Sequence, residues 1–233
     1  GPSTLRSVLT DNARQIATSV FITLTLSIVM AGLLPAFSRF WAFAIRLLIP
    51  WLSLEARLAN ADSLIPAIEA NASLPAGGHL VHAAAALIFM LVARFSLRPP
   101  FRTLLISIGA LHLLNTAISA VFPSAFPYTL TEHTHWLALF TVGLMLALPL
   151  IMLITHAIIE RSLERRIFAT LLICTYFILT LPVKLVAHAA LILSFGQLAT
   201  PTLFLLLGPA FDIFLLTALY AFVVTWRHNP AAA

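Results

Sequence analysis

The residues with the greatest capacity for chemistry lie in the apolar stretch 167–195, at every fourth position: Tyr176, Thr180, Lys184 and His188. In a helix this spacing places the four side chains in one stripe along a single face. Pro182 lies in the same stretch and would leave one backbone carbonyl without its helical donor. Ionisable groups are costly inside a membrane and commonly mark functional sites there, so Lys184 and His188 are candidates.

A carboxylate and a second polar group stand at comparable depth in other apolar stretches. Counting the helical rise from the inner end of each span places Lys184 about 25 Å and Asp212 about 21 Å from the inner membrane face. The same count places His112 and Asn115 at roughly 16 and 21 Å. We therefore expect Lys184 to reach Asp212, and expect all these groups to line one polar cavity. Two structural explanations stay open: a buried ion pair, and ordinary hydrogen bonds between helices.

Histidine is the second chemical signal, because the chain has eight histidines among few polar residues. Imidazole is the commonest metal ligand in proteins and also ligates haem. Five histidines fall toward one side of the predicted topology and form a tentative ligand set for haem or a transition metal. They are His79, His82, His133, His135 and His188. The alternative is that they are interfacial histidines near helix ends, since their spacings match no specific zinc signature.

The composition defines the setting for these groups. The chain has 233 residues, of which 61% are hydrophobic and only 9% charged, against roughly 25% charged in ordinary soluble domains. So few charges cannot cover a soluble surface without exposing apolar patches far larger than soluble monomers tolerate. The basic residues form no cluster with interleaved aromatics, which argues against a nucleic-acid partner. The sequence therefore predicts an all-α polytopic membrane protein in contact with the lipid bilayer.

Six stretches are long and apolar enough to span a bilayer, which takes about 20 residues at 1.5 Å rise each. We predict a single transmembrane domain over 1–233, with a cytoplasmic segment 1–15 before the first span. Gly1, Pro2 and Ser3 resemble the scar of a cleaved tag, and we expect the first span to be retained rather than removed as a signal peptide. The predicted spans are Ile16–Phe37, His79–Leu97, Phe101–Phe122, Trp136–Ile159, Ile167–Phe195 and Pro201–Trp226.

The longest connection, 38–78, is predicted to be amphipathic and to lie on the outer side. Its first part, Phe40–Trp51, is too apolar for a free loop, and its tryptophans suit the headgroup level. We predict an outer interfacial helical segment there, between the first and second spans. Leu54–Glu69 mixes charged and apolar residues and is predicted to form a short amphipathic cap.

Basic residues predict the orientation, because cytoplasmic connections carry an excess of Lys and Arg. With the N-terminus inside, nine of the 13 basic residues fall on the inner side and three on the outer, and Lys184 lies within the membrane. This distribution favours a multi-pass protein of a bacterial-type inner (cytoplasmic) membrane with both termini cytoplasmic. The inner group is Arg6, Arg14, Arg94, Arg98, Arg102, Arg161, Arg165, Arg166 and Arg227.

No signature of a soluble enzyme occurs, such as a phosphate-binding loop or a nucleophile elbow, so the sequence names no reaction. The favoured function is binding or transport of a small molecule or ion through a polar intramembrane cavity lined by Lys184, His188, Asp212, His112 and Asn115. The first alternative is a haem- or metal-binding membrane protein. The second is a structural subunit that packs beside a larger membrane protein partner.

Overall fold

The computed structural model describes residues 2–59, 63–72, 74, 77–123, 129–159 and 163–225. Within these residues six helical segments are long and apolar enough to cross a membrane. The predicted all-α polytopic architecture is therefore confirmed, and the chain is a multi-pass integral membrane protein. The predicted end of the sixth span, Trp226, and the charged connection 160–162 lie outside the described residues.

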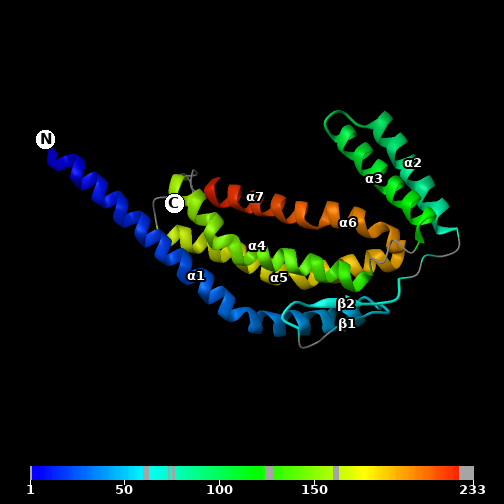
Figure 1. Ribbon diagram of the computed structural model, residues 1–233, viewed down its shortest axis with the longest axis horizontal. Helices are drawn as coiled ribbons and strands as arrows, with labels where there is room; N and C mark the ends of the chain where they lie inside the picture. Colours follow the sequence, from blue (N-terminus) through cyan, green and yellow to red (C-terminus); the bar gives the residue numbers. More distant parts are fainter. Residues whose placement is uncertain are drawn as a thin grey trace, which may run out of the picture.

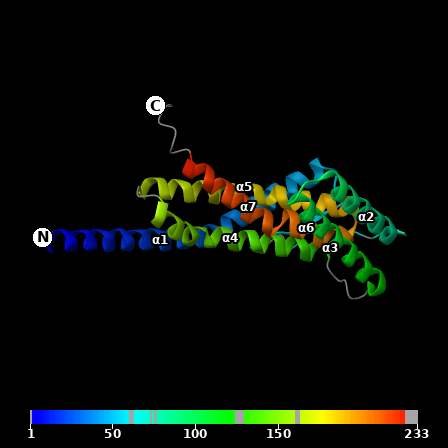
Figure 2. The ribbon, with the colours of Figure 1, turned by 90° about the horizontal axis from the view of Figure 1, so that it is seen from above.

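The first helix is longer than predicted. Helix α1 runs without a break from Pro2 to Trp51, so the segment Phe40–Trp51 is helical as predicted but continues the first span rather than forming a separate helix. Its residues Trp41, Ile45 and Ile49 recur every four positions and are buried, because this part of α1 packs on α4 and α5. The N-terminal half of α1 projects past the other helices in both views (Figure 1, Figure 2).

The second half of the long connection forms a small antiparallel ribbon where the sequence predicted an amphipathic cap. Strand β1, Arg57–Ala59, pairs with β2, Ala67–Glu69, and the register sets Arg57 opposite Glu69. Ile68 is fully buried, and its backbone N–H donates to Thr134 Oγ1 at 2.8 Å. The ribbon is thereby attached to the first turns of α4.

The C-terminal part of α1 forms the main bundle together with α4, α5 and the two helices of the sixth span. Helix α4 spans Leu130–Ile159 and α5 spans Leu163–Phe195; the two pack along each other and carry most of the fully buried side chains. After a short 3-10 turn, η2 at Gln197–Ala199, the sixth span consists of α6, Thr200–Leu207, and α7, Pro209–Thr225. The predicted sixth span is thus broken at Gly208.

Helices α2, Gly78–Ser96, and α3, Phe101–Val121, form a hairpin that matches the second and third predicted spans to within two residues. The hairpin starts beside the ribbon end of the bundle and splays away from it (Figure 1). Its main contacts with the bundle are those of α3 with α6 and with the η2 turn, and His82 of α2 reaches the end of α5.

Candidate functional site

The predicted pair of charges is present in the main bundle. Lys184 Nζ on α5 lies 2.6 Å from Asp212 Oδ2 on α7, and the two side chains are 12% and 3% exposed. Thr141 of α4 completes the group, because its hydroxyl donates to Asp212 Oδ2 at 2.7 Å and accepts from Lys184 Nζ at 3.2 Å. Three membrane-spanning helices therefore meet at one buried, hydrogen-bonded ion pair.

The break in the sixth span positions Asp212. Proline is favoured in the first turn of a helix, and Pro209 begins α7. A side chain at Gly208 would collide with the backbone carbonyl of Phe204, so only glycine fits this close approach. Asp212 consequently stands in the first turn of α7, where the positive end of the helix dipole favours a carboxylate.

A pair of histidines lies next to the ion pair. His188 follows Lys184 by one turn on the same face of α5, and its Nδ1 lies 2.9 Å from Nε2 of His133 on α4. Both rings are buried, at 1% and 0% exposure. His188 Nε2 lies 3.3 Å from the carbonyl oxygen of Leu207, the last residue of α6. Because a carbonyl only accepts, His188 Nε2 carries a hydrogen, and a neutral His188 accepts at Nδ1 from His133.

The Lys184–Asp212 ion pair contributes little net free energy to the stability of the fold. At 2.6 Å and an effective dielectric constant of about 20, the attraction is on the order of 6 kcal/mol. Removing two ions from water costs several kcal/mol each, which largely cancels that gain. The pair is consequently hard to explain as a source of stability, although removing one partner alone would leave an expensive uncompensated charge.

A second polar group lies elsewhere, between the α2–α3 hairpin and the turn from α5 to α6. His82 Nδ1 on α2 lies 3.0 Å from His112 Nε2 on α3. His82 Nε2 lies 2.6 Å from the carbonyl of Phe195, where α5 ends, and His112 Nδ1 lies 2.8 Å from Thr202 Oγ1. Beside them, Asn115 donates from Nδ2 to the carbonyl of Leu198 at 3.0 Å.

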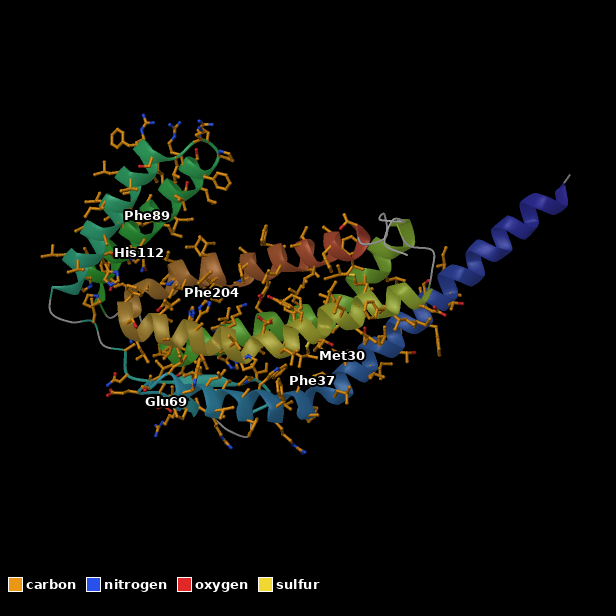
Figure 3. All side chains as sticks on the ribbon, turned by 180° about the vertical axis from the view of Figure 1, so that it is seen from behind. Met30, Phe37, Glu69, Phe89, His112 and Phe204 are labelled. Atoms are coloured by element: carbon orange, nitrogen blue, oxygen red, sulfur yellow. The ribbon has the colours of Figure 1, made fainter. Side chains whose placement is uncertain are left out.

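The structure therefore divides the predicted cavity residues into two sites. Lys184, His188 and Asp212 come together, whereas His112 and Asn115 bond to the η2–α6 region. The depth count placed all of them at one level, but depth along a helix says nothing about which helices are neighbours. The hairpin, on which Figure 3 labels His112, splays away from the main bundle and contacts it mainly through α6 and the η2 turn.

Tyr176 and Thr180, the other two residues of the predicted stripe, contact neighbours within α5. Two residues at the site, Thr141 and His133, were not predicted to belong to it. Thr180 donates its hydroxyl to the carbonyl of Tyr176 one turn earlier, and the Tyr176 ring packs edge-on against Phe177. Sequence reasoning did not assign Thr141 to the site, and it placed His133 only in the tentative metal set. Thr141 is eight residues after His133, so a polar stripe on α4 was a readable signal.

The tentative metal ligands occupy separate places. His79 Nε2 lies 3.3 Å from Ser119 Oγ, and the His135 ring packs against Trp136, while the other three belong to the two histidine pairs just described. Across the described parts of the chain, no group of three or more His, Cys, Asp or Glu side chains is arranged to hold a metal ion. The haem or metal hypothesis stays a prediction.

One further ion pair lies outside the spans and serves as a reference for the buried one. On the ribbon, Arg57 makes two hydrogen bonds of 3.0 Å to the Glu69 carboxylate, and both side chains are exposed. The hydrogen bonds and charge of Arg57 lower the pKa of Glu69 from its ordinary value, and those of Glu69 raise the pKa of Arg57. This pair has the same charges as Lys184 and Asp212 but keeps its contact with solvent.

The fold and the buried ion pair define a polytopic membrane protein with charged groups inside its helix bundle. Comparison with protein-family models, with curated proteins and with solved structures finds no match for this chain.

Proposed function

We propose that the protein passes a small ion across the membrane, with the Lys184–Asp212 pair as the exchangeable charge. The observation that carries this proposal is a lysine and an aspartate at 2.6 Å, almost fully buried among membrane-spanning helices. Intramembrane charges of this kind commonly belong to ion pathways and proton relays. A purely structural role is the weaker explanation, because apolar residues of similar volume are often as stabilising as a buried ion pair.

The enclosed geometry favours the proton among small ions. A proton can move along a short N···O contact without opening the bundle, whereas a hydrated ion needs space around Asp212. Protonation of Asp212 would release the Lys184 ammonium from its partner. His188 lies one turn away from Lys184 on the same face of α5 and is hydrogen-bonded to His133 of α4, so the released ammonium has a polar pair beside it.

Proton flux into liposomes tests the proposal. The purified chain is reconstituted with a trapped pH dye, and a potassium diffusion potential drives proton entry. We expect the wild type to exceed empty liposomes, and expect the variant carrying both Lys184→Met and Asp212→Leu to lose at least about 90% of that flux. The matched control carries Arg57→Gln and Glu69→Gln, which remove an exposed ion pair and should leave the flux unchanged.

Two results would count against this function. A wild-type protein no faster than empty liposomes would remove proton passage altogether. A folded double variant of Lys184 and Asp212 with wild-type flux would show that the ion pair serves the structure alone.

The proposed orientation places both termini in the cytoplasm of a bacterial-type cell, with the chain in its inner membrane. The excess of basic residues on one side supports it, and the start of α1, the end of α4, the start of α5 and the end of α7 lie toward one end of the molecule (Figure 1). A membrane-impermeant maleimide should label Glu55→Cys in cells with a permeable outer envelope, and Arg98→Cys only after lysis. The native Cys174 is buried, which keeps the background low.

A structural subunit remains a second candidate on one observation. The N-terminal half of α1 projects past the bundle, and Phe21 and Ile28 there are each 71% exposed. Because the first span covers 36 residues, it exceeds the roughly 20 that a bilayer requires. Replacing both residues by alanine should lower the abundance of the protein in cells if this surface binds a membrane partner, and normal abundance would oppose that function.

A further inference from the structure

A cavity of about 910 Å³ lies between the α2–α3 hairpin and the region where α5 turns into α6. This volume is near the upper end of the range for small-molecule pockets, which is roughly 300–1,000 Å³. None of the residues that line the cavity is Asp, Glu, Lys or Arg. The cavity is distinct from the Lys184–Asp212 pair, neither of whose residues contributes to its wall. A ligand that fits it is uncharged.

The walls of the cavity are mostly apolar and suit a hydrocarbon chain. Ala85 and Phe89 line it from α2, and Leu203 and Leu206 line it from α6. Figure 3 shows Phe89 and His112 on the same hairpin, and both residues line the cavity. Because the lining residues belong to membrane-spanning segments, a molecule dissolved in the lipid is the natural occupant.

The polar part of the wall is a hydrogen-bonded chain whose direction can be deduced. The carbonyl of Phe195 can only accept, so His82 Nε2 carries the hydrogen of that 2.6 Å contact. A neutral His82 then accepts at Nδ1, which makes His112 Nε2 the donor. A neutral His112 in turn accepts at Nδ1 from the Thr202 hydroxyl.

This direction determines what the cavity can recognise. The only proton of the Thr202 hydroxyl is committed to His112, while its oxygen keeps acceptor capacity toward the cavity that Thr202 lines. The chain therefore offers a hydrogen-bond acceptor at the polar end of an apolar cavity. A hydroxyl group complements this acceptor, whereas an ether oxygen in the same place does not.

We propose that this cavity binds a neutral amphiphile, whose hydroxyl donates to Thr202 Oγ1 and whose apolar chain lies between the hairpin and α6. Long-chain isoprenoid alcohols and lipid-soluble hydroquinones share this chemistry. The inference goes beyond ion passage at Lys184 and Asp212, because it concerns different residues and a different kind of ligand.

Equilibrium binding to the purified full-length chain in detergent tests the proposal. The probes are geranylgeraniol, decyl hydroquinone, and the methyl ether of each. We expect at least one alcohol to bind, and its ether to bind about 3- to 10-fold more weakly, which corresponds to one hydrogen bond. Tighter binding of geranylgeraniol would assign the site to isoprenoid alcohols, and tighter binding of decyl hydroquinone would assign it to hydroquinones.

Two pairs of variants separate recognition from folding. Thr202→Val removes the acceptor and should lower the affinity for the alcohol to that for the methyl ether. Thr217→Val, the same change on α7, should leave the affinities for both the alcohol and the ether unchanged. Ala85→Phe fills the cavity and should abolish binding of both probes. Ala84→Phe, the neighbouring position that does not line the cavity, should leave binding intact.

The proposal is overturned if neither alcohol binds, if alcohol and ether bind equally well to the wild type, or if Ala85→Phe binds like the wild type. Phosphatidylglycerol that displaces the alcohol at equal concentration would also overturn it, because the cavity would then hold ordinary membrane lipid. Proton flux is a separate readout, so failure of ligand binding leaves the function proposed for Lys184 and Asp212 unaffected.

Discussion

Replacing Asp212 alone should destabilise this protein more than replacing Asp212 and Lys184 together. Asp212→Leu leaves the Lys184 ammonium buried at 12% exposure, with the neutral Thr141 hydroxyl as its acceptor in place of a carboxylate. Breaking a buried ion pair by removing one partner costs about 3–5 kcal/mol of unfolding free energy. Thr141 itself loses little, because its single hydroxyl proton can turn from Asp212 to the carbonyl oxygen of Leu137, 3.0 Å away.

The double variant Lys184→Met with Asp212→Leu removes both charges and replaces them with apolar side chains. It loses an attraction on the order of 6 kcal/mol, worked from the 2.6 Å separation, but it also avoids the desolvation of both ions. We expect a net change within about 2 kcal/mol of the wild type, in either direction. Because removing either partner alone costs about 3–5 kcal/mol, the coupling energy between the two positions should be at least about 4 kcal/mol.

Chemical unfolding in bicelles, followed by circular dichroism, measures the four members of this double-mutant cycle. The exposed pair Arg57 and Glu69 provides a matched cycle, in which coupling should be far weaker because solvent screens it. The reasoning is refuted if Asp212→Leu costs less than about 1 kcal/mol, or if the two single costs simply add. Either result would mean that Lys184 and Asp212 do not form a desolvated pair.

The remaining predictions concern the supports of the site and the ribbon. Gly208→Ala should cost about 1–3 kcal/mol in the same unfolding assay because its Cβ meets backbone, while Gly143→Ala, with open space around its Cβ, should be neutral or slightly stabilising. Trp41→Phe should cost about 1–3 kcal/mol by removing the indole N–H from a buried carbonyl. Arg57→Gln should raise the pKa of Glu69 toward its ordinary value in an NMR titration. Because the folded pKa of Glu69 is lowered, the stabilisation lost in that variant is present above the unfolded pKa, near 4.3, and disappears as the pH falls through the folded pKa.

The spans were predictable because hydropathy over about 20 residues reports directly on burial in lipid. The two spans of the hairpin agree with α2 and α3 to within one residue at each end, and the predicted fifth span, Ile167–Phe195, coincides with the membrane-spanning part of the longer helix α5. The first span was cut short at Phe37 because the following stretch, with its arginines and tryptophans, matches an interfacial helix equally well. Its place in the bundle depends on the Trp41 stripe packing on α4 and α5, which local sequence does not contain.

Within the candidate site, the contact between Lys184 and Asp212 was predictable, because opposite charges at similar depth in the membrane usually pair with each other. The partition of the other polar residues was not. Asn115 and Asp212 have nearly the same predicted depth, but the lateral order of helices decides that one meets Leu198 and the other meets Lys184. Lateral order arises from packing between distant segments, and a single sequence carries no direct record of it.

The backbone accounts for most of the polar side chains in the spans, but not for the ion pair. Pro182 lacks the N–H that would bond the carbonyl of Ile178, and Trp41 Nε1 donates to that oxygen at 2.9 Å. His188 and His82 donate likewise to carbonyls at the ends of α6 and α5, where no further helical turn supplies a donor.

In a bilayer an unsatisfied carbonyl costs several kcal/mol, so these three side chains have a structural reason to be polar. Lys184 and Asp212 satisfy no backbone group of this kind; their contacts are with each other and with Thr141, whose hydroxyl already has an acceptor in Leu137. A bundle that needed only to fold could replace both by apolar residues. The presence of both charges is therefore better explained by a role in ion passage than by a role in stability. The proton flux of the double variant of Lys184 and Asp212 decides between these two explanations.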